Sequence, residues 1–316
     1  MFKHVRDIDR KRQVALNDLD SRQSAAVHRV ALALDDAKQP NVMTATLLAD
    51  VLRSYLGTHS SIRLLLDQRN QHPEFGADAV SLVREQIEKV FLTSLFLADW
   101  QKYVPIYFEE DWCRKYRYFL IDKQERQDLT RSKEFFDKYG PKHFESRRRH
   151  LGISPLVKEL VEFQVANPGK EVPKHLKNVL LPRLPTPGQV LKVVPAANRT
   201  FLSRWHEEYV LVCGYTHIGA DKLHMTTATG RKVNIPADEI RAFFDAVIVE
   251  KAFLSYVACA VTATELLVYT GGALEPLAEV IRFWNLLLEA SLIARVFWEI
   301  RSRALVPGAQ LAGSQS

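Results

Sequence analysis

Apolar residues recur every three to four positions along most of the chain, a spacing that places them on one face of a helix. The pattern is sparse in residues 1–40, where charged side chains dominate, and becomes dense from Asn41 onward. Residues 237–269 and 275–305 carry the two longest dense stretches. No segment shows the clear alternation of apolar and polar residues expected of a half-buried β-strand. The sequence therefore predicts an all-α fold, an irregular multi-helix bundle.

Prolines and glycines divide this pattern. Gly140-Pro141 is typical of a helix end, because proline lacks the backbone donor that a continuing helix needs. Six of the fourteen prolines lie between residues 167 and 198. We interpret this Pro-rich segment as a surface loop that interrupts a single helical domain over residues 41–305. The helices on both sides are too apolar to be stable in isolation.

The two ends of the chain differ from this domain. Residues 1–40 are expected to form a charged peripheral helix or an arm, and residues 306–316 a disordered tail. The first residues are charged where a signal peptide would be apolar. Charged side chains also interrupt the apolar stretch Ala246–Tyr269, which we interpret as a buried core helix. We therefore expect a cytoplasmic protein with no membrane partner.

Composition narrows the functional classes only a little. The chain is 47% hydrophobic and 25% charged, with a mean hydropathy of -0.14, as in ordinary globular proteins. A formal charge of +6 allows a polyanionic partner without requiring one. The three cysteines are far apart in the sequence, which favours a reducing compartment over a disulfide framework. Well-marked nucleotide, zinc-protease and esterase motifs are absent from the sequence.

One segment of the second half concentrates reactive side chains. On a helix, Arg199, His206, Cys213, His217 and His224 would lie along one line. Thiols and imidazoles bind first-row metals, but residues 206 and 224 would be roughly 27 Å apart on a straight helix. A helix interface lined by these groups is the simpler interpretation. We therefore expect no metal and no other cofactor.

Two arginine–histidine pairs point to phosphodiester chemistry. Guanidinium binds phosphate oxygens through two parallel hydrogen bonds, and imidazole titrates near neutral pH, so a pair on one helix can hold and protonate a phosphodiester. Arg53 and His59 lie within two helical turns of each other, and so do Arg199 and His206. The arrangement resembles the ribonuclease motif of HEPN domains. Because the chain has ten histidines, two such pairs also arise by chance, and the alternatives stay open.

A third pattern carries a more extended resemblance. His59-SSI-Arg63 lies in one expected helix, Arg84-EQI-Glu88 lies in the next, and Tyr209-VLV-Cys213-GYT-His217 lies in a later one. The pattern resembles an uncharacterised bacterial family of helical, HEPN-like domains, marked by an Arg-x-x-x-Glu helix and a later Tyr-x-x-x-Ser-x-x-x-His helix. This chain departs from the family by having Cys213 where serine is usual, which puts a role for that hydroxyl in doubt.

The resemblance covers about residues 45–125 and 200–265, and it implies a HEPN-like core with peripheral helices. It carries five positions over as candidate site residues, namely Arg84, Glu88, Tyr209, His217 and His59. The implied activity is metal-independent endoribonuclease cleavage in a defence or stress setting. His217 would then act as acid or base, Arg84 would hold the phosphate, and Tyr209 and Glu88 would orient them. RNA is the corresponding candidate partner.

Two observations keep other interpretations open. Rings and cations alternate from Trp112 to Tyr118, and Arg147, Arg148 and Arg149 are consecutive. Both features suit contact with nucleic acid, although rings that pack inward beneath solvated cations explain them equally. The alternative function is a noncatalytic interaction module that forms a homodimer through its apolar C-terminal helices. In that case the polar cluster of Arg84, Glu88, Tyr209 and His217 only fixes how the helices pack.

Overall fold

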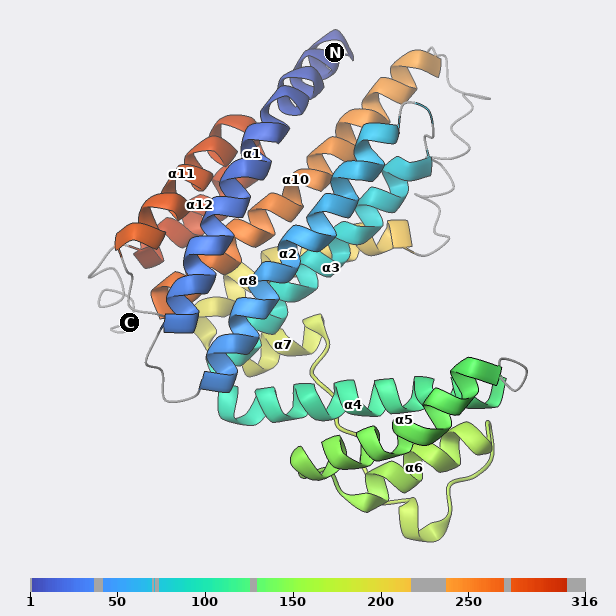
Figure 1. The fold of residues 1–316 in the computed structure, drawn as a ribbon. Coiled ribbons are helices and arrows are strands. Elements are labelled where there is room, and N and C mark those ends of the chain that lie inside the picture. The colour runs from blue at the N-terminus through green and yellow to red at the C-terminus, as the bar shows by residue number, and fades with distance from the viewer. Residues whose placement is uncertain are drawn as a thin grey trace. The chain divides into compact units, whose positions relative to one another are not determined.

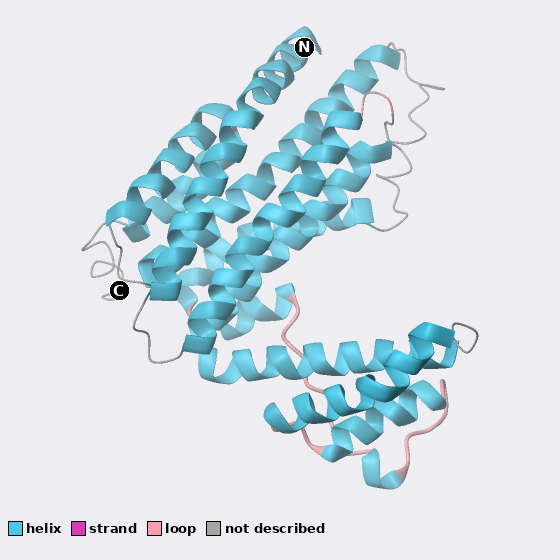
Figure 2. Cartoon of the chain, in the orientation of Figure 1, coloured by secondary structure: helices cyan, strands magenta, loops and turns pink. Residues whose placement is uncertain are grey.

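The computed structural model describes residues 2–36, 42–69, 71, 74–125, 130–216, 237–269 and 274–305. Over these residues it contains eleven α-helices and one short 3₁₀-helix, with no strand (Figure 2). The predicted all-α class is therefore confirmed. Two compact units are present, and we refer to Met1–Ala98 with Pro187–Ser316 as unit 1 and to Asp99–Thr186 as unit 2. The domain limits drawn from the sequence stay a prediction, because compactness does not show which segments fold independently.

Unit 1 is a bundle built around one apolar helix. Its helices are α1 (Phe2–Asp36), α2 (Val42–Gln68), α3 (Glu74–Ala98), α7 (Pro187–Val193), α8 (Ala196–Thr216), α10 (Ala237–Tyr269), α11 (Leu274–Ala290) and α12 (Leu292–Leu305). Helix α10 packs against α1, α2, α3, α11 and α12, and Figure 1 shows α1 and α2 running along it. All side chains from Ala252 to Thr264 are buried as a result. This agrees with the core helix predicted from the apolar stretch.

Within the described residues, one segment, Asp245–Tyr269, is long and apolar enough to cross a membrane by length and composition alone. About 78% of its most apolar window is buried inside unit 1, as in the core helix of a soluble protein. Burial against neighbouring helices already accounts for its apolar surface.

Helix α1 shows how a sparse apolar pattern is used. Its described apolar side chains fall on one stripe that includes Leu16, Leu19, Val27 and Leu34, all almost completely buried. This stripe packs against α2, α10 and α11, while the charged residues between its members face solvent, except for the partly buried Asp20. Residues 16–36 thus belong to the core of unit 1. The sequence predicted a peripheral helix or arm for residues 1–40 because large apolar side chains are sparse there.

Unit 2 consists of α4 (Trp100–Glu125), α5 (Thr130–His150), α6 (Pro155–Ala166) and the 3₁₀-helix η1 (Lys174–Leu176). Aromatic rings of α4, including Trp112, Tyr116 and Phe119, form its core with Val157 and Val161 of α6. The indole of Trp112 donates a hydrogen bond of 3.0 Å to the carbonyl of Phe144 on α5. Ser154 caps α6 and accepts from the backbone N–H of Leu156.

The helix end expected at Gly140-Pro141 is wrong, because α5 continues through both residues. A Cβ added at Gly140 would overlap the ring of Phe119, so the glycine allows α5 to approach α4 closely. Packing of this kind can offset the roughly 3 kcal/mol that a proline costs inside a helix. The expected disordered tail, 306–316, lies outside the described residues.

The contact at Gly140 yields a stability prediction. Gly140→Ala is expected to lower the free energy of unfolding by about 1–3 kcal/mol, because the added methyl group displaces the buried Phe119 ring. Gly57→Ala is the matched control, since a Cβ at Gly57 meets no atom within 4 Å and the residue lies inside α2. The control should gain about 0.5–1 kcal/mol from lower chain entropy. Urea unfolding followed by circular dichroism measures both, and an equal effect at the two sites would contradict the prediction.

Candidate functional site

Arg84 and Glu88 lie one turn apart on α3 and form an ion pair. The guanidinium Nε atom of Arg84 donates to Oε1 of Glu88 at 2.9 Å. Both side chains are partly open to solvent, with exposed fractions of 31% and 39%. Their helix is held by buried neighbours such as Val83 and Ile87, which fix the rotation of α3. The pair therefore sits at the edge of the core.

Tyr209 of α8 completes this cluster from across the helix interface. Its hydroxyl donates to Oε1 of Glu88 at 3.1 Å, and the Cζ atom of Arg84 lies 5.8 Å from the centre of the Tyr209 ring. The three residues Arg84, Glu88 and Tyr209 are referred to below as the Arg84 cluster. The resemblance names Tyr209 together with this pair, and the structure shows the contact. Any catalytic role stays a prediction.

The protonation states in the Arg84 cluster follow from its surroundings. Burial, together with the negative charge of Glu88, raises the pKa of Tyr209 to about 12, so the phenol stays protonated at neutral pH. Partial burial alone would lower the pKa of Arg84, but the hydrogen bond and charge of Glu88 raise it overall. Tyr209 is therefore a hydrogen-bond donor, and proton transfer near neutral pH requires another group.

The nearest imidazole described is that of His206, one turn before Tyr209 on α8. Its ring centre lies 6.3 Å from that of Tyr209 and 6.5 Å from that of Phe91. A Cβ added at Gly188 would come within 3.2 Å of the His206 ring, so α7 also lies against it. His217, the predicted acid or base, lies outside the described residues, as does His224.

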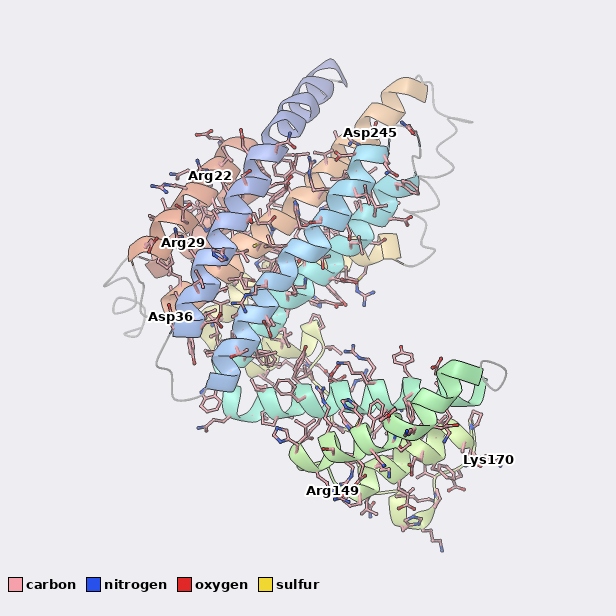
Figure 3. The ribbon with its side chains drawn as sticks, viewed as in Figure 1. Arg22, Arg29, Asp36, Arg149, Lys170 and Asp245 are labelled. Atoms are coloured by element: carbon pink, nitrogen blue, oxygen red, sulfur yellow. The ribbon has the colours of Figure 1, made fainter. Side chains whose placement is uncertain are left out.

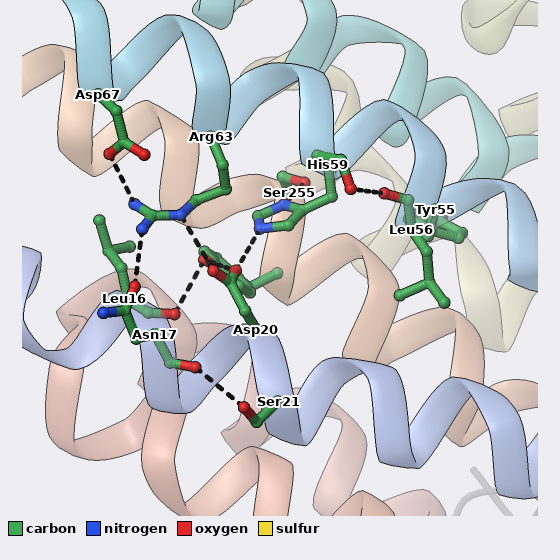
Figure 4. A network of polar contacts seen from close by, with 12 residues as sticks. Leu16, Asn17, Asp20, Ser21, Tyr55, Leu56, His59, Arg63, Asp67 and Ser255 are labelled. Atoms are coloured by element: carbon green, nitrogen blue, oxygen red, sulfur yellow. Dashed lines mark hydrogen bonds and ion pairs between the residues drawn. The ribbon is translucent and has the colours of Figure 1, made fainter.

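His59 does not join the Arg84 cluster. It is buried between α1, α2 and α10, with an exposed fraction of 4%. Its Nε2 atom is 2.9 Å from Oδ1 of Asp20, and its Nδ1 atom is 3.0 Å from Oγ of Ser255 (Figure 4). Tyr256 also donates to Asp20, at 2.6 Å, and Arg63 donates from the other side, at 3.1 Å. These five residues are referred to as the Asp20 network.

The Asp20 network fixes the tautomer of His59. A carboxylate can only accept, so Nε2 of His59 carries the hydrogen and Nδ1 accepts from Ser255. Burial lowers the pKa of His59 despite the adjacent Asp20, which keeps the ring neutral. Burial by itself would raise the pKa of Asp20, but hydrogen bonds from His59 and Tyr256 bring it below its usual value.

An acid, an imidazole and a hydroxyl in a row also suggest a nucleophilic triad. However, Ser255 is completely buried on α10 and has no access for a substrate. The Asp20 network therefore serves to hold α1, α2 and α10 together. Sequence reasoning missed Asp20 and Tyr256. The available signal was a carboxylate at the centre of the apolar stripe of α1, because a charge placed there must find a partner.

The predicted line of reactive residues on α8 is only partly described. Arg199, His206 and Cys213 do belong to this one helix. Arg199 donates to the carbonyl of Val194 at 3.4 Å. Within the described part of the chain, no three His, Cys, Asp or Glu side chains come together in a way that could hold a metal ion. The expectation that the protein holds no metal or other cofactor stays a prediction.

Comparisons of the chain with models of protein families, with curated protein sequences and with solved structures found no match. The structure supports one statement of class, namely that the protein is all-helical. The HEPN-like interpretation therefore depends only on the short motifs in the sequence and on the geometry described above.

The Asp20 network makes stability depend on pH. Because the folded-state pKa of His59 is lowered, the unfolded chain binds more protons once the pH falls below about 6.5, and the free energy of unfolding decreases there. The lowered pKa of Asp20 acts in the same direction at lower pH. At pH 7.5 the free energy of unfolding of His59→Gln should be about 1–3 kcal/mol lower than that of the wild type. On acidification to pH 5.5 it should fall by less than the wild-type value does.

Urea unfolding at the two pH values measures this difference. His28→Gln is the matched control, because it removes an exposed imidazole from α1. It should behave as the wild type within about 0.5 kcal/mol. Identical pH dependence in the wild type and in His59→Gln would rule out His59 as the source.

Proposed function

We propose that the Arg84 cluster binds a phosphodiester of RNA and that the protein cleaves RNA without a metal ion, as the HEPN-like resemblance implies. The proposal includes a HEPN-like core in unit 1 and a cytoplasmic location. The proposal is based on one observation. Among the described residues, no oxygen accepts a hydrogen bond from either Nη atom of Arg84, whose Nε atom is held by Glu88.

This arrangement suits anion recognition. A guanidinium binds two phosphate oxygens best when it is held in a fixed plane and its outer nitrogens are available. Glu88 and the Tyr209 ring both restrict the Arg84 side chain, by a hydrogen bond and by a cation–π contact. The partial exposure of Arg84 leaves access for a ligand.

Cleavage would follow the metal-independent route of intramolecular attack. The ribose 2′-hydroxyl loses its proton and attacks phosphorus, the bond to the 5′-oxygen breaks, and that oxygen takes up a proton. Arg84 would stabilise the added negative charge on the phosphoryl oxygens. Tyr209 stays protonated and orients Glu88. We assign the proton transfers to His217, as the motif implies.

The first test uses a mixed RNA pool with the purified full chain. Wild-type protein should cleave in the presence of EDTA, and the Arg84→Ala/His217→Ala double variant should be slower by at least about 100-fold, because it lacks both phosphate binding and proton transfer. Arg282→Gln/His28→Ala is the matched control, since it removes the same residue types from exposed sites. It should cleave as the wild type does. Absence of cleavage by wild type, or equal cleavage by all three proteins, would refute the nuclease proposal.

The second candidate function, a noncatalytic homodimer, is favoured by a different observation. Leu292 and Val296 lie one turn apart on α12 and both are exposed, Leu292 by 66%. Adjacent exposed apolar residues on a C-terminal helix are typical of a surface that another protein covers. Dimerisation there is compatible with either role of the Arg84 cluster.

Leu292→Glu/Val296→Glu tests the dimer. Wild-type protein should sediment as a dimer and the variant as a monomer, because charges would then be buried in the interface. Leu180→Glu, which changes a more exposed leucine in unit 2, should leave the dimer intact. Analytical ultracentrifugation measures all three. A wild-type monomer at high concentration would exclude this candidate.

A further inference from the structure

The positive charge of the protein is concentrated in unit 2. Residues 99–186 contain 18 Lys and Arg against 13 Asp and Glu, so five of the six net positive charges lie there. Unit 1 is close to neutral although it is more than twice as long. Net charge matters for binding only where it gathers on one surface, and two clusters in unit 2 show where it gathers.

The first cluster surrounds Asp111 on α4. Arg114 and Lys115, in the next turn of α4, contact its carboxylate at 2.9 and 2.7 Å. Arg147 of α5 approaches it to 3.8 Å. Burial would raise the pKa of Asp111, but hydrogen bonds from Lys115 and Arg114 bring it below its usual value, so the carboxylate stays charged. Three cations share one nearly buried anion, and the charge of the neighbouring Glu110 offsets part of the positive excess at Arg114.

The second cluster surrounds Glu145 on α5. Arg148 and Arg149 contact its carboxylate at 2.8 and 3.0 Å, and Lys158 of α6 lies 3.5 Å from it. The hydrogen bond from Arg148 is the main reason that the pKa of Glu145 falls to about 2. Again three cations share this anion. Lys158 also lies 3.8 Å from Glu162, which reduces the excess here.

The two clusters meet at the end of α5. Arg147 belongs to the first cluster and the next two arginines belong to the second, so three consecutive residues at the end of α5 connect the two clusters. Arg149 is the most exposed of the six, at 75%, and is labelled in Figure 3. The carboxylates hold the cation stems in place, and Arg114, Lys115 and Arg149 keep their charged ends exposed. Arg148 is mostly buried and also donates to the carbonyl of Ile153. A surface of this kind is already ordered before a polyanion binds.

We propose that the two clusters of unit 2 form a docking surface for the phosphate backbone of single-stranded RNA. The choice of RNA among polyanions depends on the function proposed above. Exposed Tyr118 on α4 lies on the same unit and provides a ring on which an unpaired base can stack. By contrast, Trp112 and Tyr116 are buried in the core of unit 2 and take no part.

Binding of single-stranded RNA by the full chain tests this surface. The RNA carries 2′-O-methyl groups so that it cannot be cleaved, and affinity is measured by fluorescence anisotropy over a range of salt concentrations. Arg114→Gln/Arg149→Gln should bind at least about tenfold more weakly at low salt. Its slope of log K against log salt should be shallower by about 1.4, because each lost phosphate contact contributes about 0.7. Each central carboxylate keeps two cations, so the fold should persist, as thermal unfolding can verify.

Arg29→Gln/Arg282→Gln is the matched control. It removes two exposed, ion-paired arginines from unit 1 and changes the net charge equally. It should bind as the wild type does. Equal weakening by both double variants would show that only net charge matters and would overturn the proposal. Unchanged binding by Arg114→Gln/Arg149→Gln would also overturn it. Loss of binding to phosphatidylserine vesicles without loss of RNA binding would assign the surface to membranes instead, which also overturns it.

The failure of either proposal can be recognised separately. Arg84→Ala/His217→Ala should retain binding that depends on Arg114 and Arg149, because those residues are untouched. Binding of this kind by a wild-type protein that cleaves no RNA would refute the nuclease and keep the docking surface. The opposite outcome is also possible. If Arg84→Ala/His217→Ala loses cleavage while Arg114→Gln/Arg149→Gln cleaves and binds RNA as the wild type does, the nuclease is kept and the docking surface is refuted.

Discussion

The cost of partly burying Asp20, whose side chain is 36% exposed, constrains how three helices of unit 1 pack together. A carboxylate inside the apolar stripe of α1 loses hydration, and only hydrogen bonds that favour the charged form can compensate. These come from His59 and Arg63 of α2 and from Tyr256 of α10, so the carboxylate determines how three helices meet. Apolar packing alone would allow α1 to slide or rotate against its neighbours. The Asp20 network selects one arrangement.

Two of the predicted site residues, His59 and Arg84, differ in how well they are suited to binding a ligand. Each of His59 and Arg84 lies next to a carboxylate, but the surroundings differ. His59 is enclosed by α10 and both of its ring nitrogens have partners. Arg84 lies at the edge of the bundle, and among the described residues only its Nε atom is hydrogen-bonded. A site for a ligand needs unused hydrogen-bonding capacity as well as access. By this criterion the Arg84 cluster is the better candidate.

The sequence predicted the elements that follow from local periodicity. Apolar spacing indicated the all-helical class, and Arg84 and Glu88 four residues apart indicated a shared helix face. It could not predict which side chains from distant segments would meet. His59 was grouped with Arg84 because both belong to one motif, although the Asp20 network holds it elsewhere. Gly140 was interpreted as a helix end because its partner, the ring of Phe119, lies on another helix.

Charge is used differently in the two units. In unit 1, buried Glu208 accepts from Lys251 at 2.8 Å, and this pair connects α8 to α10. In unit 2, Asp111 and Glu145 each gather three cations, more than neutralisation requires. One cation neutralises a carboxylate, and the additional cations around Asp111 and Glu145 repel each other. Repulsion of this kind is relieved when an anion binds, which is why the excess in unit 2 points to a ligand.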